Sequence, residues 1–438
     1  MKIKKGILGG AIILGAGAFI AKLLGALYRV PLTNLIGGYG LGLYQMVFPV
    51  YSALLDFSGA GAPNAVSKIV SSYQKEERRY SAEKVLFVSK RLFSVLGLIA
   101  SLIMATFSSV IARAQGDGSA FYAYLTLAPA VFFVCLISCY RGYFQGFMDM
   151  TPTAVSQIVE QVVKISLGLI FVKVLLPKIP KAVAGATLAI TISEIIALIY
   201  LIFSHRKRKP IKNFLPLKRE EFNKIAISVI KYALPLTLVG IIIPLSQIAD
   251  SFIIINTLNK NAVNGTLIFG LFSGVALTVM NLPVSICYGV ATASVPAISG
   301  EDDKEKRKQK AKKSIFLTLI FSLPCVIFCF FFSNFIIGVL FRNLAVEEKQ
   351  ISTILLKILS LGIILLSLLQ TQNAVLIGAG RKYFPVISLG VGVTIKIILE
   401  IILLKMSSLS IYAGAIALIA CYFIANLLNF IWIKKVGL

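Results

Sequence analysis

The sequence is poor in the residues on which most enzyme and metal sites depend. Its 438 residues include one histidine, six cysteines and 18 acidic side chains. His205 lies in a basic stretch, where we expect a cytoplasmic loop, so it cannot complete a buried Ser/His/Asp triad or zinc site. The chain has no P-loop of the kind that cradles nucleotide phosphates. These absences argue against an enzyme, and we expect no cofactor and no resident metal.

The cysteines lie inside apolar runs, and two pairs of them are spaced i, i+4. This spacing suits a metal ion, but no histidine accompanies it in the apolar runs. We therefore predict buried, reduced thiols.

Apolar residues are abundant instead. They make up 58% of the chain and the mean hydropathy is +0.88, whereas a soluble domain is about 45–50% apolar. Runs longer than the ~20 residues that cross the membrane as a helix recur throughout. They predict an all-α polytopic membrane protein with about 12 transmembrane helices. The predicted spans are 7–36, 42–70, 85–112, 121–147, 153–176, 182–204, 225–256, 266–298, 315–341, 351–378, 384–404 and 412–433.

Positive charge is in large excess, with a net charge of +26. In a soluble protein this excess would suggest nucleic acid, but here alternate loops hold nearly all of it. The positive-inside rule places those loops and both termini in the cytoplasm. We expect contacts with anionic membrane lipids and none with nucleic acid. The basic segments are Lys2–Lys5, Lys75–Lys84, Arg206–Lys224, Lys304–Lys313, Arg381–Lys382 and Lys434–Lys435.

An internal repeat relates the two halves of the chain at an offset of about 230 residues. Residues 59–67 match 289–297, and residues 146–164 match 378–396. The repeat predicts two six-helix lobes that run in the same direction through the membrane. They would be an N-terminal lobe over residues 1–204 and a C-terminal lobe over 225–438, joined by a basic cytoplasmic linker over 205–224.

Charged and amide side chains lie within several predicted spans, where a lone charge is costly unless it faces a partner or a water-filled cavity. Gln157, Glu160, Gln161 and Lys164 follow the i, i+3, i+4, i+7 spacing of one helix face. We expect a hydrophilic cavity between the halves. The candidate substrate-binding residues are Lys22, Arg29, Asp56, Arg141, Gln157, Glu160, Lys164 and Lys396.

Lys22 and Arg29 lie on one side of the first helix and could together hold a pyrophosphate, the arginine as a planar fork and the lysine as a point charge. Alternatively, Arg29 snorkels to the interface. Asp56 is a candidate counter-ion for Lys22.

Other charges have equally open roles. Glu160 with Lys164, and Lys396 with Glu400, could simply neutralise each other as i, i+4 pairs. Asp250 and Glu194 have no such neighbour and are candidates for ion coupling through Na⁺ or a proton. Counted over the expected cavity, cations and acids balance, so charge alone does not identify the substrate.

Two motif regions resemble the stage V sporulation protein B family. The first is Lys22-Leu-Leu-Gly-Ala-Leu-Tyr-Arg-Val-Pro-Leu32 with Gly40–Gln45 and Pro49–Tyr51. The second is Arg141-Gly-Tyr-Phe-Gln-Gly146 followed by Met150–Gln157 and Glu160-Gln161. This family belongs to the multidrug/oligosaccharidyl-lipid/polysaccharide exporter superfamily, together with the MurJ lipid II flippases and the multidrug and toxin extruders (MATE).

The resemblance implies a V-shaped, MATE-like transporter in the bacterial cytoplasmic membrane. It would move an undecaprenyl-pyrophosphate-linked sugar, a lipid II-like peptidoglycan precursor for which the spore cortex is one destination, by alternating access. First-helix cations contact the pyrophosphate in the related flippases, and Lys22 and Arg29 match them. Those flippases usually carry fourteen spans, so the resemblance leaves open how this chain would hold the lipid tail. A cation-coupled multidrug antiporter, and a scaffold that recruits wall-synthesis enzymes, are the alternatives.

Overall fold

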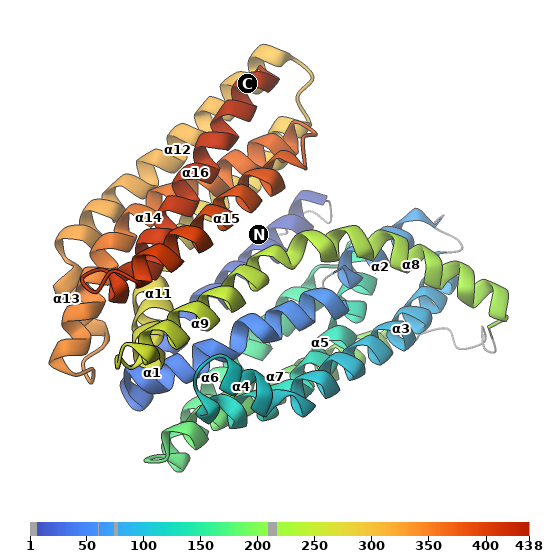
Figure 1. Ribbon diagram of the computed structural model, residues 1–438. Coiled ribbons are helices and arrows are strands. Elements are labelled where there is room, and N and C mark those ends of the chain that lie inside the picture. The colour runs from blue at the N-terminus through green and yellow to red at the C-terminus, as the bar shows by residue number, and fades with distance from the viewer. Residues whose placement is uncertain (1–6, 60, 74–77, 209–216, 438) are drawn as a thin grey trace. The chain divides into compact units, whose positions relative to one another are not determined.

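The structure is a computed structural model that describes residues 7–59, 61–73, 78–208 and 217–437. The side chains of several helical residues, including Lys22, are outside the described part. Within these ranges the regular elements are all helices (Figure 1), which confirms the predicted all-α class.

The first helices alternate long apolar segments with short connections. They are α1 (Ile7–Gly59), α2 (Ala62–Ser72), α3 (Arg78–Thr106), α4 (Ser108–Ala114), α5 (Phe121–Gly146), α6 (Thr151–Leu175), α7 (Ile179–Lys207) and α8 (Arg219–Gly240). The remainder are α9 (Ile242–Lys260), α10 (Gly265–Phe269), a π-helical segment (Gly270–Ala276), α11 (Leu277–Ser299), α12 (Lys304–Phe331), α13 (Ser333–Leu340), α14 (Val346–Gly378), α15 (Phe384–Leu404) and α16 (Ala413–Val436). Short 3₁₀ turns cover Gly118–Ala120 and Ser410–Tyr412.

By length and hydropathy, 9 helical stretches of the described residues are able to cross a membrane, which confirms a multi-pass membrane protein. The first two predicted spans share one of these stretches, Phe19–Ser72. Two other predicted spans are helical but are not among the 9: α6, and the pair α8 and α9, which meet at Ile241. The count of twelve spans stays a prediction.

Helix α1 has 53 residues, about 80 Å if straight, and is broken at Gly37. Gly37 has φ 69° and ψ −178°, a backbone conformation open to glycine and strained for residues with a Cβ. The break falls between the predicted spans 7–36 and 42–70, and the residue that forms it is a glycine.

The chain divides into two compact units. The first unit comprises α1 as far as Tyr28 together with Met46–Ile248, and the second comprises Arg29–Gln45 and Ala249–Leu438. These units differ from the predicted ranges 1–204 and 225–438, which stay a prediction as transport lobes.

Close packing explains both differences. In the second unit the α1 segment lies against α10 and the π-helical segment that follows it: a Cβ on Gly42 would be 2.0 Å from the carbonyl oxygen of Thr266 in α10. Glycines allow such backbone approach. In the first unit, α8 packs on α2 and α3: a Cβ on Gly61 would meet the backbone of Ala233, and Lys84 forms an ion pair with Glu221.

Helix pairings recur in the two units. In the first, α5 contacts α3 and α7, and α7 contacts α6; in the second, α14 contacts α12 and α16, and α16 contacts α15. The connections after Gly146 and Gly378, which the sequence repeat matches, occupy the same place in this order.

Each unit has a buried apolar cluster that fixes its helices. In the first unit the cluster draws on α2, α3, α5, α7 and α8, through Val66, Val85, Phe144, Leu201 and Val229 among others. In the second unit a cluster joins α11, α12, α14 and α16, through Ile298, Ala311, Val375, Leu376 and Ile433.

Candidate functional site

A polar cluster lies inside the first unit, where α5, α6 and α7 meet. Arg141 of α5 places Nη2 3.2 Å from Oε2 of Glu160, and its Nε donates to Ser156 Oγ at 3.1 Å. Gln161 Nε2 donates to the other Glu160 oxygen at 3.1 Å. Glu160 is thus bonded to Arg141 across the helices. The sequence spacing had suggested Lys164, four residues later, as a partner of Glu160, and it gave no indication of Arg141.

Three further predicted residues lie in or beside the same cluster. Glu194 of α7 is 5% exposed, its Oε2 has no hydrogen-bond partner among the described residues, and it is close enough to Glu160, Arg141 and Lys164 to interact electrostatically. Gln157 is on the same face of α6, and its buried Oε1 also lacks a partner in the described part. With two cations and two acids, the cluster is neutral when all four groups are ionised.

Helix α1 approaches this cluster through a glycine. A Cβ on Gly25 would be 3.2 Å from Gln161 Oε1 and 3.9 Å from Lys164 Nζ. The absence of a side chain on Gly25 therefore lets α1 approach the polar face of α6 closely at this level. The sequence pattern predicted the polar face, but the glycine opposite it was not singled out.

A second charged cluster lies in the second unit, where α9 and α15 meet. Lys396 Nζ donates to Asp250 Oδ2 at 2.5 Å, and the two residues are 2% and 7% exposed. Glu400 follows one turn after Lys396, is fully buried, and is close to Asp250. Cys421 and Tyr422 of α16 adjoin the same charges. Sequence reasoning assigned separate roles to Lys396 and Asp250, whereas the structure joins them in one ion pair.

Arg29 differs from the other predicted cations. It is half-buried in the second unit, and its Nη1 donates to Thr278 Oγ1 at 3.0 Å. Within the described part of the chain it forms no ion pair with an acid. Because Thr278 is neutral, no carboxylate of the described residues offsets the guanidinium charge, which is the pattern expected of a site for an anion.

The structure says less about two other predicted residues, Lys22 and Asp56. The side chain of Lys22 is outside the described residues, so its position relative to Arg29 or Asp56 stays a prediction. Asp56 is partly exposed in the first unit, and a Cβ on Gly240 of α8 would lie 3.5 Å from its carboxylate.

One prediction about the histidine is wrong. His205 lies inside α7 and is 9% exposed, and its Nε2 lies 3.0 Å from Glu83 Oε2. Tyr143 donates to Glu83 Oε1 at 2.7 Å, so one carboxylate joins α3, α5 and α7. An imidazole can be buried when its nitrogen has such a partner. Helix α7 continues through His205, Arg206 and Lys207 because cationic residues are favourable at a helix C-terminus.

Amides of α16 form a polar contact that sequence reasoning missed. Asn429 Nδ2 donates to Asn373 Oδ1 at 2.7 Å, and Asn426 Nδ2 donates to the Leu365 carbonyl at the same distance. Their i, i+3 spacing on an otherwise apolar helix was the available signal.

Metal-binding geometry is not found among the residues that the structure describes: no group of three or more His, Cys, Asp and Glu side chains is placed to hold an ion. The cysteines are free thiols; five of them are buried and Cys325 is half-buried. The predicted burial is therefore confirmed for five cysteines, whereas Cys325 is less buried than expected.

Long apolar helices that enclose buried ion pairs define a multi-pass membrane protein with a transporter-type fold. The chain belongs to the polysaccharide biosynthesis protein family, whose sequence model matches residues 7–301. The MatE model matches residues 235–402 as well, and together these matches confirm the resemblance to the exporter superfamily.

Two relatives from Bacillus subtilis (strain 168) match nearly the whole chain. Stage V sporulation protein B is 28% identical over 444 residues, which cover 99% of this chain and 84% of that protein. Lipid II flippase MurJ is 29% identical over 458 residues, which cover 98% of this chain and 82% of that protein.

Solved structures share the fold. The inward-facing conformation of a multidrug resistance MATE family transporter superposes with a TM-score of 0.78 at 17% identity, covering 95% of this chain and 94% of that one. Lipid II flippase MurJ in an inward closed conformation gives a TM-score of 0.74 at 18% identity, covering 97% of this chain and 87% of that one.

Proposed function

We propose that the protein is a flippase that moves an undecaprenyl-pyrophosphate-linked sugar across the bacterial cytoplasmic membrane. The substrate would be a lipid II-like peptidoglycan precursor, with the spore cortex as one destination. The observation that carries the proposal is Arg29, a half-buried guanidinium that bonds a threonine hydroxyl and no acid in the described part of the chain. The relatives named stage V sporulation protein B and lipid II flippase MurJ support the same substrate class.

The predicted binding residues do not support the proposal equally. Arg141 and Lys396 already have acid partners in Glu160 and Asp250, so an anionic ligand would have to compete with those carboxylates. Arg29 has no such competitor in the described part, and Lys22 matches the second first-helix cation of the related flippases. We therefore assign the pyrophosphate to Arg29 and Lys22. Lys164, Gln157 and Asp56 remain candidates for the sugar headgroup.

Transport would follow alternating access, with the predicted lobes over residues 1–204 and 225–438 rocking around the headgroup while the prenyl chain stays in lipid. Both termini and the linker over residues 205–224 would be cytoplasmic. Glu194 and Asp250 are the candidates for coupling to a proton or Na⁺, and the membrane potential is the third candidate energy source. Each of the two acids is buried beside at least one cation, so uptake of an ion there would change the charge balance of its cluster.

The test is leaflet-to-leaflet movement of undecaprenyl-pyrophosphate-linked disaccharide pentapeptide in proteoliposomes. We expect the wild type to move it and Lys22→Ala/Arg29→Ala to lose that movement. Arg113→Ala/Lys181→Ala is the matched control, because it removes two exposed cations of the first unit. Loss of transport in both double variants, or in neither, would refute the pyrophosphate assignment. An inactive wild type under an imposed potential or ion gradient would refute the flippase.

The rival function is a cation-coupled multidrug antiporter, favoured by the MatE match over residues 235–402. For an antiporter the acids would form the substrate site. Neutralising Asp56, Glu194 and Asp250 would then abolish export of cationic dyes, and the cation substitutions would have little effect. A non-transporting scaffold would tolerate both sets.

A further inference from the structure

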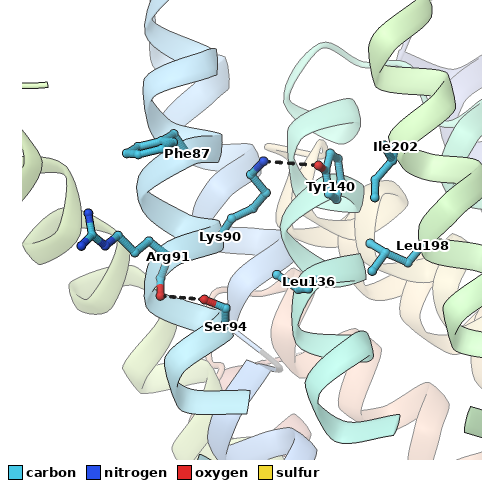
Figure 2. Close-up of a pocket in the computed structure, with 8 residues that line it drawn as sticks. All are labelled: Phe87, Lys90, Arg91, Ser94, Leu136, Tyr140, Leu198 and Ile202. Carbon is cyan, nitrogen blue, oxygen red and sulfur yellow. Dashed lines mark hydrogen bonds between the residues drawn. The ribbon is translucent and has the colours of Figure 1, made fainter. Parts of the chain in front are cut away.

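A cavity of about 540 Å³ lies in the first unit between α3, α5 and α7 (Figure 2), and the ring of Tyr140 in its wall lies 5.7 Å from that of His205. Most of its wall is apolar, with Leu136 from α5 and Leu198 and Ile202 from α7. Its charged side chains are Lys90 and Arg91 of α3, and no acid lines it. The cavity is therefore both apolar and electropositive.

Lys90 is not a lysine that extends along its helix to reach water. Figure 2 shows its side chain directed across the cavity to Tyr140, whose hydroxyl accepts a hydrogen bond from Nζ at 3.3 Å. The same ammonium lies 5.3 Å from the centre of the Tyr140 ring, and Tyr140 is buried. Within the described residues neither Lys90 nor Arg91 has an acid partner. A cation held this way inside an apolar wall is suited to an anionic ligand.

Lys90 lies near the edge of the hydrocarbon layer, within a lysine side chain's length of the phosphates of one leaflet. From Lys90 to the end of α3 at Thr106 the helix rises about 24 Å, somewhat less than the ~30 Å thickness of the hydrocarbon layer. The other end of α3 carries Arg79 and Lys84, so Lys90 lies just inside the basic edge of the layer. Apolar side chains such as Ile99 of α3 and Phe203 of α7 are exposed on the same helices, as on a surface that faces lipid.

We propose that this cavity binds an anionic glycerophospholipid from the leaflet at the basic end of α3. The lipid phosphate accepts from the Lys90 ammonium and from the Tyr140 hydroxyl, whose own hydrogen is not used in the bond with Lys90. One acyl chain lies along Leu136, Leu198 and Ile202. Arg91 points away from Tyr140, toward the ring of Phe222 on α8, and supplies positive charge at the rim. Basic cavities between membrane helices bind anionic headgroups in this manner, and the volume is within the ~300–1,000 Å³ of ligand sites.

The test is native mass spectrometry of the full chain with phosphatidylglycerol or phosphatidylcholine of the same acyl chains. We expect the wild type to retain phosphatidylglycerol preferentially, and Lys90→Gln to lower its retention about tenfold, the loss of one charge-assisted contact. Lys90→Arg should restore most of it. The matched control, Arg206→Gln/Lys207→Gln, removes two exposed cations at the basic end of α7 and should leave retention unchanged.

A second variant tests the apolar wall without altering charge. Leu198→Trp fills the cavity and should also lower retention, and it decides the matter if Lys90→Gln fails to fold. Equal retention by the wild type and a folded Lys90→Gln, or an equal loss in the Arg206/Lys207 control, overturns the site. Displacement of phosphatidylglycerol by undecaprenyl phosphate at equimolar concentration overturns the choice of ligand, because the cavity would then belong to the carrier lipid.

Discussion

Lys396 on α15 and Asp250 on α9 form a buried ion pair between segments 146 residues apart in the chain. Each charge lowers the cost of burying the other. Because of this pairing, neither residue acts independently: a ligand that binds one of them releases or repels the other. Glu400, which is fully buried one turn after Lys396, adds a second carboxylate to the same cation.

Replacing Lys396 by methionine should destabilise the second unit strongly. The substitution leaves the Asp250 carboxylate buried without its cation, and breaking a buried pair from one side costs about 3–5 kcal/mol. Thermal unfolding of the purified protein in detergent should show a marked fall in Tm. The double variant Lys396→Met/Asp250→Asn should recover part of the loss, because Asp250 is then neutral and only Glu400 still lacks the cation. Additive losses in the double variant would contradict a direct pair.

Alanine at Gly42 should damage the same unit for a steric reason. A Cβ there would lie 2.0 Å from the Thr266 carbonyl oxygen, a backbone atom that cannot move aside as a flexible side chain does. We expect a large loss of stability or failure to accumulate in the membrane.

Gly390 of α15 is the matched control for Gly42, because an added Cβ meets nothing within 4 Å there. Gly390→Ala should be neutral or stabilise the helix by up to about 1 kcal/mol. Expression and Tm of the two single variants measure the contrast. Equal behaviour would show that α1 does not pack on α10 as closely as described.

The sequence predicted the fold class well because the bilayer imposes simple rules. Apolar runs of sufficient length give helices, and the polar face of α6 follows from the spacing of Gln157, Glu160 and Lys164. The break of α1 at Gly37 directly follows the predicted end of the first span at residue 36. These features depend on local periodicity, which a single sequence is enough to show.

Partnerships between distant residues could not be predicted in the same way. Nothing near Glu160 in the sequence indicates that Arg141 is its partner, and nothing near His205 indicates a carboxylate on α3. The sequence pattern also gave no sign that the segment Arg29–Gln45 packs within the second unit, where its glycines fit against α10. Such contacts depend on which helices meet, and periodicity does not reveal that.

Loss of the Tyr143 hydroxyl should weaken the junction of α3, α5 and α7. Tyr143→Phe leaves the buried Glu83 carboxylate with one donor fewer, and hydrogen bonds to charged groups are worth about 1.5–3 kcal/mol. Tyr122→Phe is the matched control, because the Tyr122 side chain is exposed on the same helix. Thermal unfolding should separate the two variants. A Tm for Tyr143→Phe equal to that of the control would exclude an energetic role for this bond.

The start of α12 should respond to acid through Glu301. Lys310 Nζ lies 2.6 Å from Glu301 Oε2, and this hydrogen bond lowers the pKa of the carboxyl below its ordinary value of 4.5. A carboxyl whose pKa is lowered by folding stabilises the folded state above its unfolded value, and the effect is lost as the pH falls through the folded pKa. Glu301→Gln should therefore unfold at a slightly lower temperature than the wild type at about pH 7, and the difference should vanish on acidification below the folded pKa. Asp302→Asn, which alters the exposed neighbouring acid, is the control, and a Glu301 difference that persists in acid would contradict the assignment.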